Sequence, residues 1–189
     1  MPPLQALLFA LALAGLASAQ ELVSFATEDG GVVFADLYGK GERGVVLAHG
    51  GRFNKESWAK QARALEAAGF RVLAIDFRGY GKSRGGPHIK PDAAEASAES
   101  KRGEIDRIVL LAAPADAPEK LKGRKLFIVA RDDVSGDGPR LPGIRASYEK
   151  TPQPKELIIL DGSAHAQFLF ETDQGERVMH EILRFLSAP

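Results

Sequence analysis

The clearest pattern of apolar and polar positions lies in residues 45–83. Residues 45–48 form a short continuous apolar run, which is typical of a strand buried on both faces. Residues 55–68 have helical periodicity, and residues 71–75 form a second apolar run. Gly69 stands where the end of a helix favours positive φ. Strand, helix and strand at this spacing predict a βαβ unit with parallel strands and a right-handed crossover. The apolar face of the predicted helix contains Trp58, Ala62, Leu65 and Ala68.

Shorter apolar runs extend this pattern on both sides. Residues 21–38 predict an antiparallel hairpin, because two strand-like runs flank a turn that contains Gly30 and Gly31. Further strands are expected over residues 105–111, 125–130 and 156–160, and helices over residues 93–100, 143–150 and 174–186. The acidic stretch 131–138 is expected to be a loop. The fold class is therefore α/β, with a mostly parallel sheet, flanking helices and an N-terminal antiparallel hairpin.

The first twenty residues differ from the rest of the chain. Residues 4–16 are mostly apolar, and Ala17-Ser18-Ala19 satisfies the small-x-small cleavage rule. The run is shorter than the about 20 residues that cross a membrane. We expect a signal peptide over residues 1–19 and a single secreted or periplasmic domain over residues 20–189. An uncleaved anchor or an apolar N-terminal helix is the alternative.

The amino-acid composition limits the partners and the types of site that can be expected. The chain has 25 basic and 25 acidic residues and no basic cluster, so nucleic acid is not an expected partner. It contains no cysteine, which excludes disulfides, a thiolate nucleophile and a zinc site built from cysteines. No metal or organic cofactor is implied by the sequence.

Three motifs follow the apolar runs in a fixed order. His49-Gly50-Gly51 follows the first strand of the βαβ unit, Trp58 lies in its helix, and the second strand leads into residues 76–83, which read DFRGYGKS. In this order the motifs resemble the first half of the α/β-hydrolase fold. The resemblance implies a serine hydrolase lineage, of esterase or peptidase type, that acts on a small ester or amide. It also implies a serine, an acid and a histidine in that chain order, with an oxyanion hole.

The resemblance assigns several of these roles to residues of this chain. His165, which follows the last predicted strand, matches the catalytic histidine of the family. Asp133, three residues beyond an earlier strand, matches the acid, and Asp132 is the alternative because one residue of slip lies within boundary error. Gly51 or Arg52 matches the backbone donor of the oxyanion hole.

Other residues near these positions have different interpretations. His49 is expected to be structural, and residues 76–81 are expected to shape a loop. A calcium site made by Asp132, Asp133 and Asp137 is a weaker alternative, because their spacing matches no known cage.

The nucleophile is the residue that the pattern does not supply. Ser83 lies in the one match to G-x-S-x-G, but it does not stand directly between a strand and a helix, as a nucleophile elbow requires. Ser163 is two residues from His165, which is too close for triad geometry. Only 28 residues (77 to 104) separate the second strand from the next one, enough for one crossover where the family has two. The sequence therefore predicts that the elbow strand is missing near residues 91–93.

Three functional interpretations follow from this missing strand. The chain is an inactive or strongly impaired hydrolase, a pseudoenzyme that binds a small molecule, or an active hydrolase that uses Ser83. Removing a central strand also leaves strand edges without partners. A homodimer in which a second molecule supplies the partner is a further hypothesis.

Overall fold

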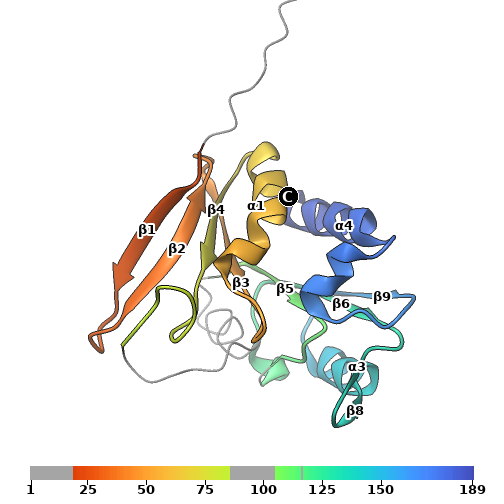
Figure 1. Ribbon diagram of the computed structural model, residues 1–189. Coiled ribbons are helices and arrows are strands. Elements are labelled where there is room, and N and C mark those ends of the chain that lie inside the picture. Colours follow the sequence, from red (N-terminus) through yellow and green to blue (C-terminus); the bar gives the residue numbers. More distant parts are fainter. Residues whose placement is uncertain (1–18, 86–104, 116) are drawn as a thin grey trace, which may run out of the picture.

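The computed structural model describes residues 19–85, 105–115 and 117–189 (Figure 1). The signal peptide expected over residues 1–19 lies outside this part of the chain except for its last residue. The helix expected over residues 93–100 also lies outside it, as does the point near residues 91–93 where the sequence predicts that a strand is missing. No helix within the described residues is long and apolar enough to cross a membrane.

The N-terminal half forms a four-stranded sheet in the order β1-β2-β4-β3. Strands β1 (Glu21–Ala26) and β2 (Val32–Tyr38) pair antiparallel, which confirms the predicted hairpin. Strands β3 (Arg43–Ala48) and β4 (Phe70–Ile75) pair parallel, as the βαβ pattern predicts. The mixed sheet arises because β2 also pairs antiparallel with β4.

One helical segment connects β3 to β4. It begins with the 3₁₀ helix η1 (Lys55–Trp58), capped by Asn54, and continues as α1 (Ala59–Ala67). Gly69 has a φ of +86°, so the helix ends with the left-handed residue that the sequence predicts. Ala68 was expected on the apolar face but is exposed, because it is the C-cap rather than part of the last helical turn. The other three residues of that face are buried.

The C-terminal half forms a second sheet of three parallel strands, in the order β5-β6-β9. The strands are β5 (Arg107–Leu111), β6 (Arg124–Ala130) and β9 (Lys155–Leu160), each within two residues of its predicted bounds. Strand β6 is the middle strand, and its side chains are buried from the second residue onward. This burial explains why its sequence reads as a continuous apolar run.

Helices cover both faces of the three-stranded sheet (Figure 1). Helix α4 (Gly175–Ser187) packs on one face, and α3 (Arg140–Lys150) packs on the other. Helix α3 begins before its predicted start at residue 143, because Pro142 lies in the first turn, where a missing N–H costs nothing. The remaining short elements are η2 (Pro118–Lys120), η3 (Ala166–Glu171), β7 (Val134–Ser135) and β8 (Gly138–Pro139). Strands β7 and β8 form a small hairpin where a loop was expected.

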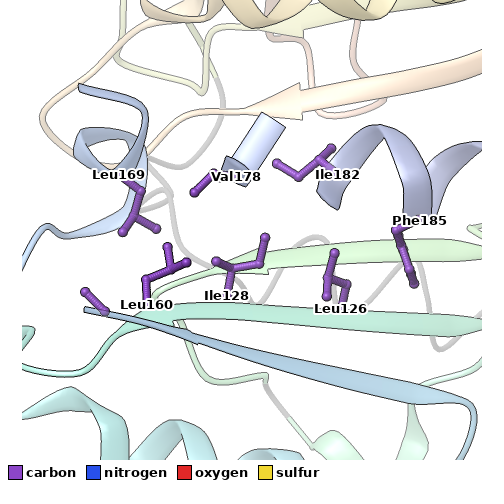
Figure 2. Packing of buried hydrophobic residues seen from close by; sticks show 8 residues of the cluster. Leu126, Ile128, Leu160, Leu169, Val178, Ile182 and Phe185 are labelled. Atoms are coloured by element: carbon purple, nitrogen blue, oxygen red, sulfur yellow. The ribbon is translucent and has the colours of Figure 1, made fainter. Parts of the chain in front are cut away.

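The buried side chains of α4 form the core of the C-terminal half (Figure 2). They point toward apolar side chains of β6, β9 and η3, and burial of this kind contributes about 25 cal/mol per Å² of apolar surface. The residues labelled in the figure are Leu126, Ile128, Leu160, Leu169, Val178, Ile182 and Phe185. Helix α4 is therefore the main cover of this face of the sheet.

Strand β3 departs from its prediction. Its sequence predicts burial on both faces, but the side chain of Val46 is 60% exposed. The reason is that β3 ends one sheet and β5 ends the other, and no strand among the described residues lies between them. An apolar run can thus indicate that a strand is suited to burial on both faces, without showing that the elements that would bury it are present.

Lys125 gives a testable prediction about stability. Its side chain is 1% exposed on β6, and its Nζ donates to the carbonyl of Gly123 at 2.7 Å. Burial, and secondly repulsion by Lys155, lower the pKa of Lys125 below its ordinary value of 10.5. Between the lowered pKa and 10.5 the unfolded chain binds more protons than the folded chain, so the contribution of Lys125 to stability should rise with pH.

Replacing this lysine should remove that pH dependence. We expect Lys125→Met to raise the free energy of unfolding at neutral pH by about 1 kcal/mol, with a smaller gain at alkaline pH. Urea unfolding at several pH values measures both effects. Lys60→Met, at an exposed position of α1, is the matched control. A destabilised Lys125→Met protein would contradict the prediction.

Candidate active site

An aspartate and a histidine meet at the carboxyl ends of the C-terminal strands. Asp133 follows β6, and His165 follows β9. Because these strands are parallel neighbours, the loops after them emerge at the same edge of the sheet. The Nδ1 of His165 lies 2.8 Å from Oδ2 of Asp133. Asp133 is 1% exposed, whereas the side chain of His165 is 41% exposed. A carboxylate only accepts, so Nδ1 carries the proton and Nε2 is left as the basic nitrogen.

The geometry distinguishes Asp133 from its neighbour. Asp132 is exposed, and its backbone N–H donates to the carbonyl of Gly162 at 2.9 Å. Asp133 is also held by Arg140, whose backbone N–H donates to the Asp133 carbonyl and whose Nε lies 3.6 Å from Oδ1. Within the described residues, no group of three potential ligands could hold a metal ion, and the set that includes Asp137 is not assembled.

His49 lies inside the fold rather than in the site. Its ring is 2% exposed, and its Nε2 accepts the backbone N–H of Phe77 at 3.2 Å. Its Nδ1 therefore carries the proton and donates to the carbonyl of Gly50 at 2.8 Å. The ring also meets Phe77 and Tyr80 edge-on. His49 thus ties the end of β3 to the loop after β4, in line with the structural role expected for it.

The proposed oxyanion loop is fixed by a residue that the sequence reasoning did not identify. The backbone N–H of Gly50 donates to Oε1 of Gln167 at 3.3 Å, and Nε2 of Gln167 donates to Oγ of Ser57 at 2.8 Å. Gln167 belongs to η3, two residues after His165, so it joins the histidine loop to the glycine loop. Gly51 lines the same hollow as His165, whereas Arg52 is not among the described residues that line it.

A buried charge network lies behind the glycine loop. Lys55, Asp36 and Asp76 are all less than 5% exposed. The Nζ of Lys55 lies 3.4 Å from Oδ1 of Asp36, and its backbone N–H donates to Oδ1 of Asp76 at 2.8 Å. Burial alone would lower the pKa of Lys55, but its hydrogen bond to Glu56 and the attraction of Asp36 outweigh burial and raise it. Lys55 therefore stays charged and anchors the start of η1.

Ser83 is held in the scaffold by two backbone groups. Its Oγ donates to the carbonyl of Asp76 at 2.8 Å and accepts the backbone N–H of Phe34 at 2.8 Å. Glycine is needed at residue 81, because a Cβ there would lie 2.0 Å from Oδ2 of Asp76. Neither Ser83 nor Ser163 is hydrogen-bonded to His165. Among the described residues, the structure thus brings together an acid, a histidine and a glycine loop, without a hydroxyl on the histidine.

This arrangement can be compared with known proteins. A family model described as "alpha/beta hydrolase fold" matches residues 44–109. The structure is also similar to an esterase of Pyrococcus furiosus, with a TM-score of 0.67 and 18% identity, over 89% of this chain and 93% of that one. The chain has the α/β-hydrolase fold. A similar match, with a TM-score of 0.67 and 13% identity over 87% of this chain and 99% of that one, is found with an esterase of Exiguobacterium antarcticum.

Sequence relatives match this chain over shorter stretches. A bifunctional epoxide hydrolase of Rattus norvegicus is 47% identical over 55 residues, which is 29% of this chain. A non-heme chloroperoxidase of Kitasatospora aureofaciens is 42% identical over 57 residues, or 30% of this chain and 20% of that enzyme. The matched segment spans only 10% of the length of the rat enzyme. The similarity to α/β hydrolases therefore rests on a short sequence segment and on the fold as a whole.

The charge network yields a prediction. Lys55→Met should lower the free energy of unfolding by about 3–5 kcal/mol, because it leaves the buried carboxylate of Asp36 without its counter-charge. Adding Asp36→Leu should restore much of the loss, since both charges are then absent. Lys82→Met, at an exposed position, is the control. Denaturant unfolding of the wild type, Lys55→Met, Asp36→Leu and the double variant tests the coupling, and additive losses in the double variant would contradict it.

Proposed function

We propose that this α/β hydrolase descends from serine esterases or peptidases and is inactive, or strongly impaired, as a serine hydrolase. The observation that carries the proposal is the pair formed by Asp133 and His165. The contact between the two side chains resembles that of the acid and the base of a triad, yet no hydroxyl among the described residues hydrogen-bonds to the histidine.

A histidine of this kind needs a partner to drive acyl transfer. In a serine hydrolase it removes the proton from the attacking hydroxyl and later returns it to the leaving group. Without that hydroxyl, only binding and oxyanion stabilisation contribute, and catalysis falls by several orders of magnitude. The interrupted sheet supports the same proposal, because the strand that would bring the nucleophile to this edge is not found between β3 and β5 in the described part of the chain.

Ser83 is a poor replacement nucleophile. Its hydroxyl proton is donated to a backbone carbonyl, and its oxygen accepts a backbone N–H. Activating it would require breaking both contacts and moving the loop that contains residues 76–83. The alternative of an active hydrolase that uses Ser83 is therefore less well supported than loss of activity.

A second candidate function is the binding of a small molecule without turnover. The observation that favours it is a hollow of about 1230 Å³ that His165, Trp58 and Phe170 help to line. Pockets that bind small molecules are commonly concave and largely apolar, with a few polar groups. A small ester, amide or related compound is the class of ligand that the hydrolase lineage suggests.

Labelling with a fluorophosphonate tests the proposal. The reagent phosphonylates activated serines, so we expect no label on the folded protein at concentrations that label an authentic serine esterase completely. Mass spectrometry of the digested protein would locate any label, and circular dichroism would show that the sample is folded. A label on Ser83, abolished by His165→Ala, would overturn the proposal and favour the active alternative.

Ester turnover provides a second readout. We expect hydrolysis of a p-nitrophenyl ester to remain near the rate of free imidazole, and His165→Ala to remove what remains. Ser83→Ala should leave that residual rate within about twofold, because its hydroxyl is engaged with the backbone. His180→Ala, a histidine of α4 outside the site, is the matched control.

A further inference from the structure

Two unpaired strand edges line one hollow. Strand β3 is the last strand of the four-stranded sheet, and β5 is the last strand of the three-stranded sheet. Residues of both strands line the hollow of about 1230 Å³. No strand among the described residues pairs with the outer edge of either one. An edge with unpaired N–H and C=O groups is a template for pairing with a further strand, and within the described residues both edges are of this kind.

The two edges run in the same direction. Strand β5 is parallel to β6, and β6 is parallel to β9, so their carboxyl ends share one side of the sheet. The carboxyl end of β3 lies on that side as well, because the backbone N–H of Gly50 donates to Gln167 in the segment that follows β9. A strand inserted between β3 and β5 could therefore pair parallel with both of them.

The side chains around the edges are apolar. Val45 and Leu47 of β3 pack in one cluster with Leu111 of β5 and with Met179 and Leu186 of α4. On the opposite face of β3 the side chain of Val46 is 60% exposed. An inserted strand would meet apolar surface on at least the face covered by α4, so its own residues should be mainly apolar.

Arginines lie at the amino ends of β3, β4 and β5. Arg43 begins β3, Arg71 is the second residue of β4, and Arg107 begins β5, and all three line the hollow. The guanidinium of Arg107 is bonded to two carbonyls at the end of α4, and that of Arg43 lies 4.3 Å from the ring of Phe70. Asp106 also lines this end and lies 3.9 Å from Arg107, so three arginines face one carboxylate and the end remains positive. A parallel strand would enter here, and acidic residues in it would complement this charge.

The composition of residues 86–104 does not match such a strand. These residues include two prolines and only one large aliphatic side chain, Ile89. An acyl chain would match the apolar walls but would leave the backbone groups of both edges without partners. A peptide in extended conformation satisfies the edges and the walls together, which is the basis of recognition by strand addition.

We propose that the hollow between β3 and β5 binds an extended segment of a separate polypeptide, in which acidic residues precede about five apolar residues. The segment pairs parallel with β3 and β5 and joins the two sheets into one. This inference does not depend on whether the protein hydrolyses esters.

A synthetic peptide tests the proposal on the full-length protein. The probe is an acetylated, amidated peptide with two glutamates followed by Val-Ile-Val-Val-Ile. Trp58 is the single tryptophan of the chain and lines the hollow, so its fluorescence reports binding. Hydrogen–deuterium exchange should show that the amides of β3 and β5 become protected when the peptide is added.

Matched peptides and variants test the mode of binding. A peptide N-methylated at alternate residues, or one with two lysines in place of the glutamates, should bind at least about tenfold more weakly. Val46→Lys should weaken binding about tenfold, because it places a charge beside the inserted strand. Val134→Lys is the control, since Val134 is similarly exposed (63%) but lies in β7.

Four outcomes would overturn the proposal. The first is the absence of any peptide binding to protein shown to be folded. The second is protection of the β3 and β5 amides in the monomer without peptide, which would assign the hollow to the chain itself. The third is the same protection in a dimer, seen by analytical ultracentrifugation, which would assign it to a second copy. The fourth is that decanoic acid displaces the peptide and changes the Trp58 fluorescence without protecting the amides of β3 and β5, which would assign the hollow to an acyl chain.

Discussion

The structure depends on the packing of one helix, α4, against both sheets. Successive positions along this helix belong to different buried clusters: Val178 and Ile182 pack on β6 and β9, while Met179 and Leu183 pack toward β4 and α1. In the part of the chain that the structure describes, no hydrogen-bonded strand joins the two sheets, so the apolar surface of α4 provides the main connection between them. The guanidinium of Arg107 strengthens this connection by donating to two carbonyls at the end of the helix.

The geometry of the candidate site depends on the packing of α4 against the two sheets. His165 and Gln167 lie in the segment between β9 and α4, whereas the glycine loop belongs to the other sheet. The hydrogen bond from Gly50 to Gln167 crosses from one sheet to the other, and it holds the glycine loop near the histidine. Any shift of α4 would change the distance between the glycine loop and the segment that contains His165 and Gln167. The site is therefore only as rigid as the contact between the helix and the two sheets.

Much of this arrangement could be predicted from the sequence. The apolar runs located the main strands of both sheets, and the spacing after β6 and β9 placed Asp133 and His165 at one edge, where they form a hydrogen bond. Such predictions succeed because the period of apolar residues and the direction of parallel strands follow from local geometry. Gln167 was missed because its hydrogen bonds join segments far apart in the chain. Arg140 was missed because its contact with Asp133 depends on the small β7–β8 hairpin between them, where a loop was expected. The exposure of Val46 was missed for a similar reason, since burial depends on neighbours that the strand itself does not encode.

Within the described residues, the gap between the two sheets and the absence of a hydroxyl on the histidine have a common physical explanation. In a parallel sheet, the residue that follows a strand lies at the carboxyl edge, beside the residues that follow the neighbouring strands. A strand placed between β3 and β5 would therefore bring its next residue into the region that Gly51 and His165 line. If this strand is absent from the chain, its backbone partners and its catalytic side chain are lost together. The aspartate and the histidine follow β6 and β9, and the pairing of these two strands does not require such a strand. On the proposed function, the fold would thus keep a well-formed pair of aspartate and histidine without the reaction that such a pair serves in a serine hydrolase.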